Sequence, residues 1–123
     1  MTTAVQNSIP TKLECANSLK NVLDALYVLN GKWKLAIVLN LMQAPKRFNE
    51  IQNEVFGISP KVLANELKHL ELNGFITRTV FDTTPVSILY EAAEYSWSLQ
   101  NVLRELSAWG GHHREKVRQS MRG

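Results

Sequence analysis

The sequence predicts an α+β fold that is mainly α-helical. The chain has 123 residues, which is the size of a single domain. Apolar residues recur at helical spacing along most of the chain. One stretch around residue 80 is instead rich in β-branched and aromatic residues, which favour strands. We therefore expect several helices and one β-hairpin.

Composition narrows the class of function. One cysteine excludes an internal disulfide and a Cys-based zinc finger. The formal net charge of +3 is mildly basic and compatible with an anionic partner. The sequence has no Gly-rich phosphate loop, spaced His/Glu metal motif or nucleophile elbow. We expect a binding protein that is not an enzyme, with no cofactor and no metal site.

The chain carries no recognisable targeting or membrane signal. Residues 1–13 are polar and small, and they are predicted to form a flexible arm. The most apolar stretch, Leu35–Met42, has eight residues, whereas a membrane span needs about 20. We expect a cytoplasmic protein without a membrane partner.

Four helices are predicted before the hairpin. They cover residues 17–29, 32–43, 47–55 and 59–72. Asn17 or Ser18 would cap the first helix, and Ser59-Pro60 is a favoured start for the fourth. The second helix is apolar nearly all round and belongs in the centre of the domain. Asn73-Gly74 would end the fourth helix.

The hairpin and a last helix complete the predicted order. Residues 75–81 and 86–90 form the two strands, and Asp82–Pro85 is turn material. The last helix starts at about Tyr95 and carries an amphipathic face. Helices, a helix–turn–helix, a two-stranded β-hairpin and a final helix together describe a winged helix-turn-helix. In this architecture the fourth helix reads DNA and the hairpin is the wing.

The fourth helix has a face that is suited to this role. Lys61, Asn65 and Lys68 share one side, roughly opposite a leucine stripe. Lysine can reach guanine or a phosphate, and asparagine can pair with adenine. The candidate DNA-binding residues are Lys46, Arg47, Ser59, Lys61, Asn65, Lys68, His69, Arg78, Thr83 and Thr84.

A second interpretation stays open. Lysine and asparagine on a helix face are often only solvated, and a winged helix can serve as a protein-interaction module without specific DNA binding. Glu66 and Glu71 also reduce the positive charge of this helix.

Several segments carry a family resemblance. They are Gly31-Lys32-Trp33, Arg47-Phe48-Asn49-Glu50-Ile51, Gly57-Ile58-Ser59-Pro60-Lys61-Val62-Leu63 and Trp109-Gly110, with Cys15 before the first helix. The chain resembles HxlR-type transcriptional regulators, a bacterial winged helix-turn-helix family, over about residues 15 to 113. We divide it into an arm, a domain over residues 14–113 and a basic tail over 114–123. Unlike the family pattern, no basic residue follows Pro85 directly.

The resemblance implies a homodimer that binds a palindromic operator in double-stranded DNA. The family dimerises through its N- and C-terminal helices. The corresponding interface residues are Leu19, Leu23, Leu99, Val102, Leu106 and Trp109. His112 and His113 are adjacent and therefore point in different directions on a helix, which argues against a metal site there.

Cys15 is a candidate redox sensor. Members of the family that respond to oxidants and electrophiles use an amino-terminal cysteine. A thiol near a helix start, with Lys12 three residues away, is expected to be a good nucleophile. An oxidant or small-molecule inducer would then act through Cys15. The alternative is a small structural residue.

Overall fold

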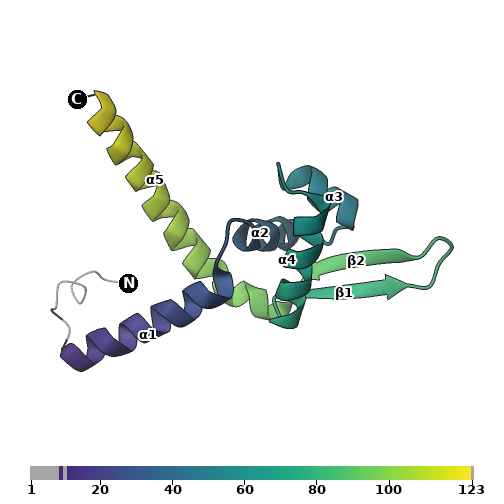
Figure 1. Ribbon diagram of the computed structural model, residues 1–123, viewed down its shortest axis with the longest axis horizontal. Coiled ribbons are helices and arrows are strands. Elements are labelled where there is room, and N and C mark those ends of the chain that lie inside the picture. Colours follow the sequence, from purple (N-terminus) through teal and green to yellow (C-terminus); the bar gives the residue numbers. More distant parts are fainter. Residues whose placement is uncertain (1–8, 10, 123) are drawn as a thin grey trace. The chain divides into compact units, whose positions relative to one another are not determined.

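The computed structural model describes Ile9 and residues 11–122 (Figure 1). The chain divides into a first unit that ends at Lys32 and a second that begins at Trp33. The first unit contains α1 (Lys12–Leu29). The second contains α2 (Lys34–Gln43), α3 (Phe48–Glu54), α4 (Pro60–Leu72), β1 (Ile76–Phe81), β2 (Ser87–Ala92), η2 (Glu94–Leu99) and α5 (Gln100–Arg122).

Helix α1 begins earlier than predicted. Thr11 is the N-cap, and Asn17 and Ser18 lie inside the helix, so the expected cap was wrong. Thr11 Oγ1 accepts from Glu14 N–H at 3.1 Å, and Thr11 N–H donates to Glu14 Oε1 at 2.8 Å. This reciprocal capping box satisfies two backbone N–H groups at the helix start. Most of the predicted arm lies outside the described residues.

The core of the second unit lies between α2, α3, α4 and the base of the hairpin. Its buried apolar side chains include Ile37, Val38, Leu41, Ile51, Leu63, Leu67, Leu70, Phe75 and Ile76. The predicted central position of α2 is confirmed, because its apolar circumference meets three neighbouring elements.

The start and the end of α4 follow the sequence signals. Ser59 is the N-cap, its Oγ accepts from Val62 N–H at 3.2 Å, and Pro60 opens the helix. Gly57 in the α3–α4 turn has φ 89° and Gly74 after α4 has φ 82°. Both lie in the left-handed region that glycine adopts without a steric penalty. The predicted helix–turn–helix is confirmed.

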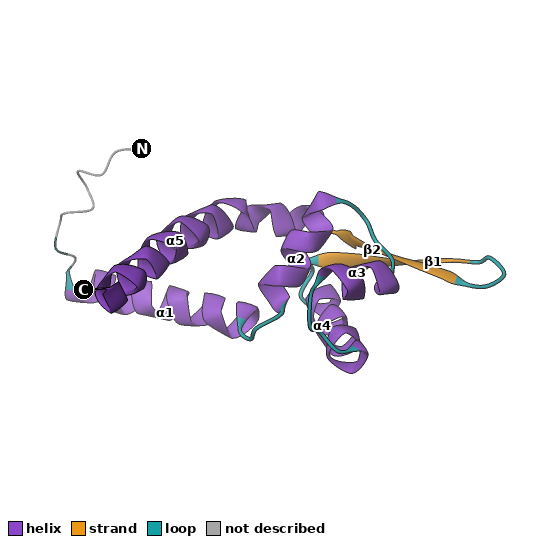
Figure 2. Cartoon of the chain, turned by 90° about the horizontal axis from the view of Figure 1, so that it is seen from above, coloured by secondary structure: helices purple, strands orange, loops and turns teal. Residues whose placement is uncertain are grey.

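The hairpin is an antiparallel pair that projects from the helical body of the second unit (Figures 1 and 2). Arg78 pairs with Tyr90, and Val80 pairs with Ile88. The winged helix-turn-helix fold is therefore confirmed. The strand β2 extends two residues past the predicted end at Tyr90.

The C-terminal helix differs from the expectation. A 3-10 helix, η2, precedes α5, and α5 continues through Trp109, Gly110 and Gly111 to Arg122. The helix therefore passes the Trp109-Gly110 segment and includes most of the tail assigned to residues 114–123. Each glycine costs a helix only about 1 kcal/mol, and no proline follows to stop it. An ion pair of Arg118 with Glu115 at 3.2 Å supports the later turns. No helix in the described part of the chain is long and apolar enough to cross a membrane.

Candidate nucleic-acid interface

Helix α4 separates a buried stripe from an exposed polar face. Leu63, Leu67 and Leu70 are almost fully buried against the core. The candidate residues Lys61, Asn65 and Lys68 are all exposed and line one surface hollow. Because the leucines pack against the core, the two lysines and the asparagine on the other face point to solvent. In this position they can contact phosphates and base edges.

The two ends of α4 offer different chemistry. The Ser59 hydroxyl accepts from the helix backbone, which leaves its proton free to donate to a phosphate at the positive end of the helix dipole. His69 is exposed in the last turn. Its backbone carbonyl accepts from the Asn73 side chain at 2.9 Å. His69 therefore lies far along the helix from Ser59, at the opposite end of the face.

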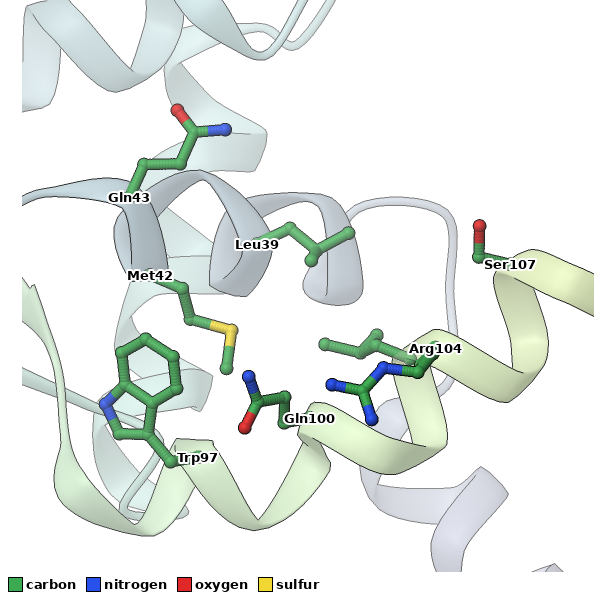
Figure 3. A pocket seen from close by; sticks show the side chains of 8 residues that line it. Leu39, Met42, Gln43, Trp97, Gln100, Arg104 and Ser107 are labelled. Carbon is green, nitrogen blue, oxygen red and sulfur yellow. The ribbon is translucent and has the colours of Figure 1, made fainter.

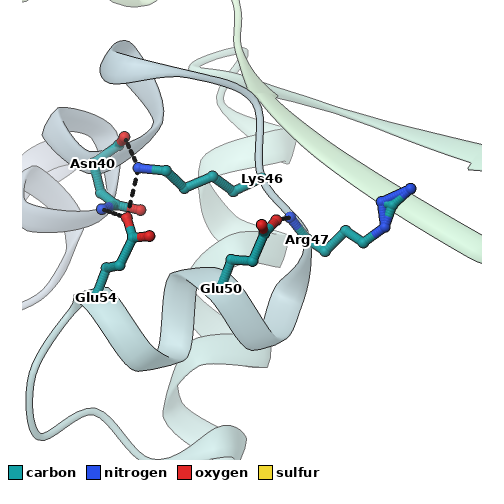
Figure 4. A network of polar contacts seen from close by, with 5 residues as sticks. All are labelled: Asn40, Lys46, Arg47, Glu50 and Glu54. Atoms are coloured by element: carbon teal, nitrogen blue, oxygen red, sulfur yellow. Dashed lines mark hydrogen bonds and ion pairs between the residues drawn. The ribbon is translucent and has the colours of Figure 1, made fainter.

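Lys46 was a candidate DNA-binding residue, but the structure places its ammonium inside the fold, where it is not available to a phosphate. Lys46 is only 8% exposed. Its Nζ donates to the Asn40 carbonyl oxygen at 2.8 Å and lies 2.8 Å from Glu54 Oε1 (Figure 4). Its backbone also exchanges hydrogen bonds with Tyr90 of the wing. Lys46 thus ties the α2–α3 link to α3 and to β2. The sequence could not reveal that Lys46 is buried, because two adjacent basic residues are typical of an exposed basic patch.

The Asn40–Glu54 contact completes this network. Asn40 Nδ2 donates to the same Glu54 Oε1 at 3.0 Å. The hydrogen bonds from Lys46 and then Asn40 hold the pKa of Glu54 below its ordinary value of 4.5. The negative charge of Glu54 is therefore favoured and compensated within the fold.

Arg47 has the opposite environment from Lys46. Its backbone N–H donates to Glu50 Oε1 at 2.7 Å, while its side chain points away from the Lys46 network (Figure 4). Arg47 and Asn49 line a hollow of about 380 Å³ together with Pro85 and Val86 near the wing tip. The fold thus brings a predicted arginine next to the wing. Asn49 was not among the sequence candidates, because only the tertiary structure shows that it shares this hollow.

The candidate DNA-binding residues of the wing differ in which side-chain atoms are available to a partner. Arg78 and Thr84 are exposed. Thr83 is also exposed, but its hydroxyl donates to the Pro85 carbonyl oxygen at 2.7 Å within the tip. The Thr83 proton is therefore used to form the turn, and only its oxygen lone pairs are available to a partner.

The predicted interface residues lie on α1, η2 and α5. Leu19 and Leu23 are exposed on α1, and no residue of that helix is buried. On α5, Val102 is exposed, and Leu106 and Trp109 are 51% and 66% exposed. The ring of Trp109 stacks on His113 at 5.0 Å.

Leu99 must be removed from the interface set. It lies in η2 and is 8% exposed, because its side chain belongs to the chain's own core. Sequence periodicity placed it on the stripe of the last helix, but the 3-10 geometry before α5 changes its direction.

Cys15 lies in the first turn of α1 and is exposed. Its backbone N–H donates to the Thr11 carbonyl oxygen at 2.9 Å, so the residue is already inside the helix. An exposed thiol can react with a small electrophile. No group of three or more His, Cys, Asp or Glu in the described ranges could hold a metal ion.

The fold and the exposed face of α4 define a helix-turn-helix protein of the winged class. The sequence model of HxlR-like helix-turn-helix proteins matches residues 28–118. The chain belongs to this family, and the transcriptional regulators among its relatives support the same class of function.

Two Bacillus subtilis proteins illustrate the similarity. The HTH-type transcriptional regulator YtcD is 38% identical over 92 residues, which cover 75% of this chain and 73% of YtcD. Its crystal structure has a TM-score of 0.73 and covers 76% of this chain and 96% of that chain. The HTH-type transcriptional regulator YodB is 41% identical over 86 residues, 70% of this chain and 77% of YodB.

Two of the similar proteins, YodB and HypR, have been solved in more than one redox state. Reduced YodB has a TM-score of 0.66 at 39% identity and covers 72% of this chain and 87% of that chain. YodB has also been solved after diamide treatment and with quinone bound. The redox regulator HypR in its reduced form has a TM-score of 0.74 at 27% identity and covers 80% of this chain and 98% of that chain.

Proposed function

We propose that this regulator binds a palindromic operator as a homodimer, with α4 in the major groove. The observation that carries the proposal is the exposed face of Lys61, Asn65 and Lys68 on a helix whose other face is buried. Arg47, Ser59, His69, Arg78, Thr83 and Thr84 would add contacts to the DNA. Two α4 helices in a dimer would lie about 34–36 Å apart, one turn of DNA. Such a regulator acts in the cytoplasm.

The exposed apolar residues of α1 and α5 support the dimer. Leu19 and Leu23 on α1, and Val102, Leu106 and Trp109 on α5, leave large apolar side chains in water. Burying them against a second copy would recover about 25 cal/mol for each Å² of apolar surface. We propose that these five residues form the interface.

The experiment that tests DNA binding is a fluorescence anisotropy titration of the full chain with DNA from its own promoter, over a range of salt concentrations. Tight binding that weakens steeply with salt supports the proposal, because phosphate contacts release counterions. Absent or salt-insensitive binding contradicts it and favours a protein-interaction module. Sedimentation velocity on the same samples measures whether the bound species is a dimer.

We further propose that Cys15 makes the regulator responsive to oxidants or electrophiles. Cys15 is exposed in the first turn of α1. The relatives YodB and HypR, solved in more than one redox state, support this proposal. Because the chain has a single cysteine, oxidation would link two subunits or add a small thiol.

A further inference from the structure

A cavity of about 420 Å³ opens between α2 and the segment formed by η2 and α5 (Figure 3). Its volume lies in the range of about 300–1,000 Å³ that is typical of small-molecule sites. Four of the eight lining residues are apolar or aromatic, and the other four are Gln43, Gln100, Arg104 and Ser107. The residues used below are Leu39, Met42, Trp97, Gln100, Leu103 and Arg104.

Trp97 supplies an aromatic surface to this cavity. Trp97 is 46% exposed, although the indole is a large apolar ring system that is costly to leave in water. The indole stands beside the thioether of Met42, and Leu39 borders the same space (Figure 3). These three side chains can enclose the faces of a flat ring.

Arg104 supplies a positive charge at the same wall. Its Nη1 donates to Asn101 Oδ1 at 3.1 Å, and no carboxylate in the described part of the chain pairs with it. A guanidinium has five N–H donors, so four remain after the Asn101 bond, and two of them can bind a carboxylate in a bidentate manner. The amide of Gln100 lies next to the guanidinium (Figure 3).

We propose that this cavity binds a small aromatic carboxylate as an effector. The ring would stack on Trp97 between Leu39 and Met42, and the carboxylate would pair with Arg104. Gln100 would hydrogen-bond a polar substituent of the ligand. Arg104 is exposed and has no carboxylate partner among the described residues, so its guanidinium is accessible to an anion beside the apolar surface of Leu39, Met42 and Trp97. This combination favours an anion that carries one or two rings over a cationic molecule.

The position of the cavity gives the ligand a route to regulation, and this step rests on the proposed function. Helix α2 packs in the helix-turn-helix body, and α5 is a proposed dimer helix. A ligand that contacts both helices binds one relative orientation of them more tightly than another. It therefore shifts the population of dimers that fit the operator.

The competing occupant is a helix from a second copy of the chain. A seam between helices would need to cover the Arg104 guanidinium, and burying an unpaired charge is costly. The charge therefore favours the anion, and the experiment distinguishes the two occupants.

The test uses the full chain and 2-naphthoate in isothermal titration calorimetry. We expect 2-naphthoate to bind at least about tenfold more tightly than 2-naphthalenemethanol, which has the same rings without the charge. Arg104→Gln should remove this preference and leave the weak binding of the alcohol unchanged. Arg118→Gln, on the same helix and outside the cavity, is the matched control and should leave both affinities unchanged.

A second variant tests the apolar part of the site. Leu39→Trp fills the cavity with a larger side chain from a partly exposed position, so the helices should persist by circular dichroism. It should abolish binding of both compounds. Equal affinity for the acid and the alcohol, or no effect of Arg104→Gln, would overturn the proposal. So would dissociation of the dimer by 2-naphthoate in sedimentation velocity, because the groove would then be the dimer seam.

The failure of this inference can be told apart from failure of the proposed function. Binding of 2-naphthoate is measured without DNA, and operator binding is measured without the ligand. A chain that binds DNA but not 2-naphthoate contradicts only the effector site. A chain that binds 2-naphthoate but no DNA contradicts the proposed function and leaves the cavity as a ligand site.

Discussion

The ammonium of Lys34 on α2 lies 2.6 Å from Glu66 Oε1 on α4, and the two side chains are 10% and 16% exposed. The pair links the central helix to the proposed reader helix at a fixed point. It also neutralises an acid on the helix that we propose to approach phosphates. In the sequence, Glu66 reduces the positive charge of this helix. The structure shows that this charge is largely compensated.

Breaking this pair should destabilise the fold. Lys34→Met leaves the Glu66 carboxylate covered and without its cation, so we expect a loss of about 3 kcal/mol in the free energy of unfolding. The double variant Lys34→Met/Glu66→Leu removes both charges and should recover most of that loss. Urea unfolding of the two variants measures the difference. Equal stability of the single and double variants would contradict this prediction, because the unpaired Glu66 carboxylate would then carry no cost.

Lys68→Ala should weaken operator binding and flatten its salt dependence. One lost phosphate contact lowers the slope of log K against log salt by about 0.9. Lys20→Ala, a lysine of α1, serves as the control with the same change of charge. Anisotropy titrations at several salt concentrations measure both quantities. A slope equal to that of the wild-type chain would mean that Lys68 does not contact a phosphate, although a base contact could remain.

Cys15→Ser should abolish release of the operator by oxidants. The hydroxyl keeps the size of the thiol but cannot form a disulfide or a thioether with a quinone. A gel shift with diamide or a quinone, compared between the wild-type chain and the variant, measures the response. Release that is unchanged by the substitution would exclude Cys15 as the sensor.

Leu106→Glu should disrupt the dimer without unfolding the chain. Leu106 is already half exposed, so a charge there costs little in the monomer but would be buried in the proposed interface. Val86→Glu places the same charge on an exposed apolar residue of the wing. Sedimentation velocity should show monomers only for Leu106→Glu. Dimers of that variant would place the interface elsewhere.

Glu54→Gln should change how the free energy of unfolding depends on pH in the acid range. The pKa of Glu54 is lowered in the fold, so its contribution is complete above the ordinary value of 4.5 and is lost as pH falls through the lowered value. The variant should therefore be less stable than the wild-type chain at about pH 7 and approach it at about pH 3. Urea midpoints at both pH values measure this. Glu105→Gln, an exposed acid of α5, should show no such convergence.

Local signals predicted most of the helix–turn–helix. Ser59-Pro60 marks the start of α4, and Gly74 occupies the left-handed conformation expected of a glycine that ends a helix. The leucine stripe of α4 also left little choice about which face is buried. These features depend on interactions within a few residues, so the amino-acid order alone determines them.

Contacts between distant elements decided the rest. The sequence presents Lys46 and Arg47 as equivalent neighbours, yet one is buried against Glu54 and the other lies beside the wing. Leu99 continues a helical stripe in the sequence but enters the core from η2. Likewise, only the tertiary structure shows that Leu39 and Met42 of α2 line one cavity with Trp97 and Arg104. Side-chain direction depends on which elements meet, and residue spacing along one helix carries no information about that.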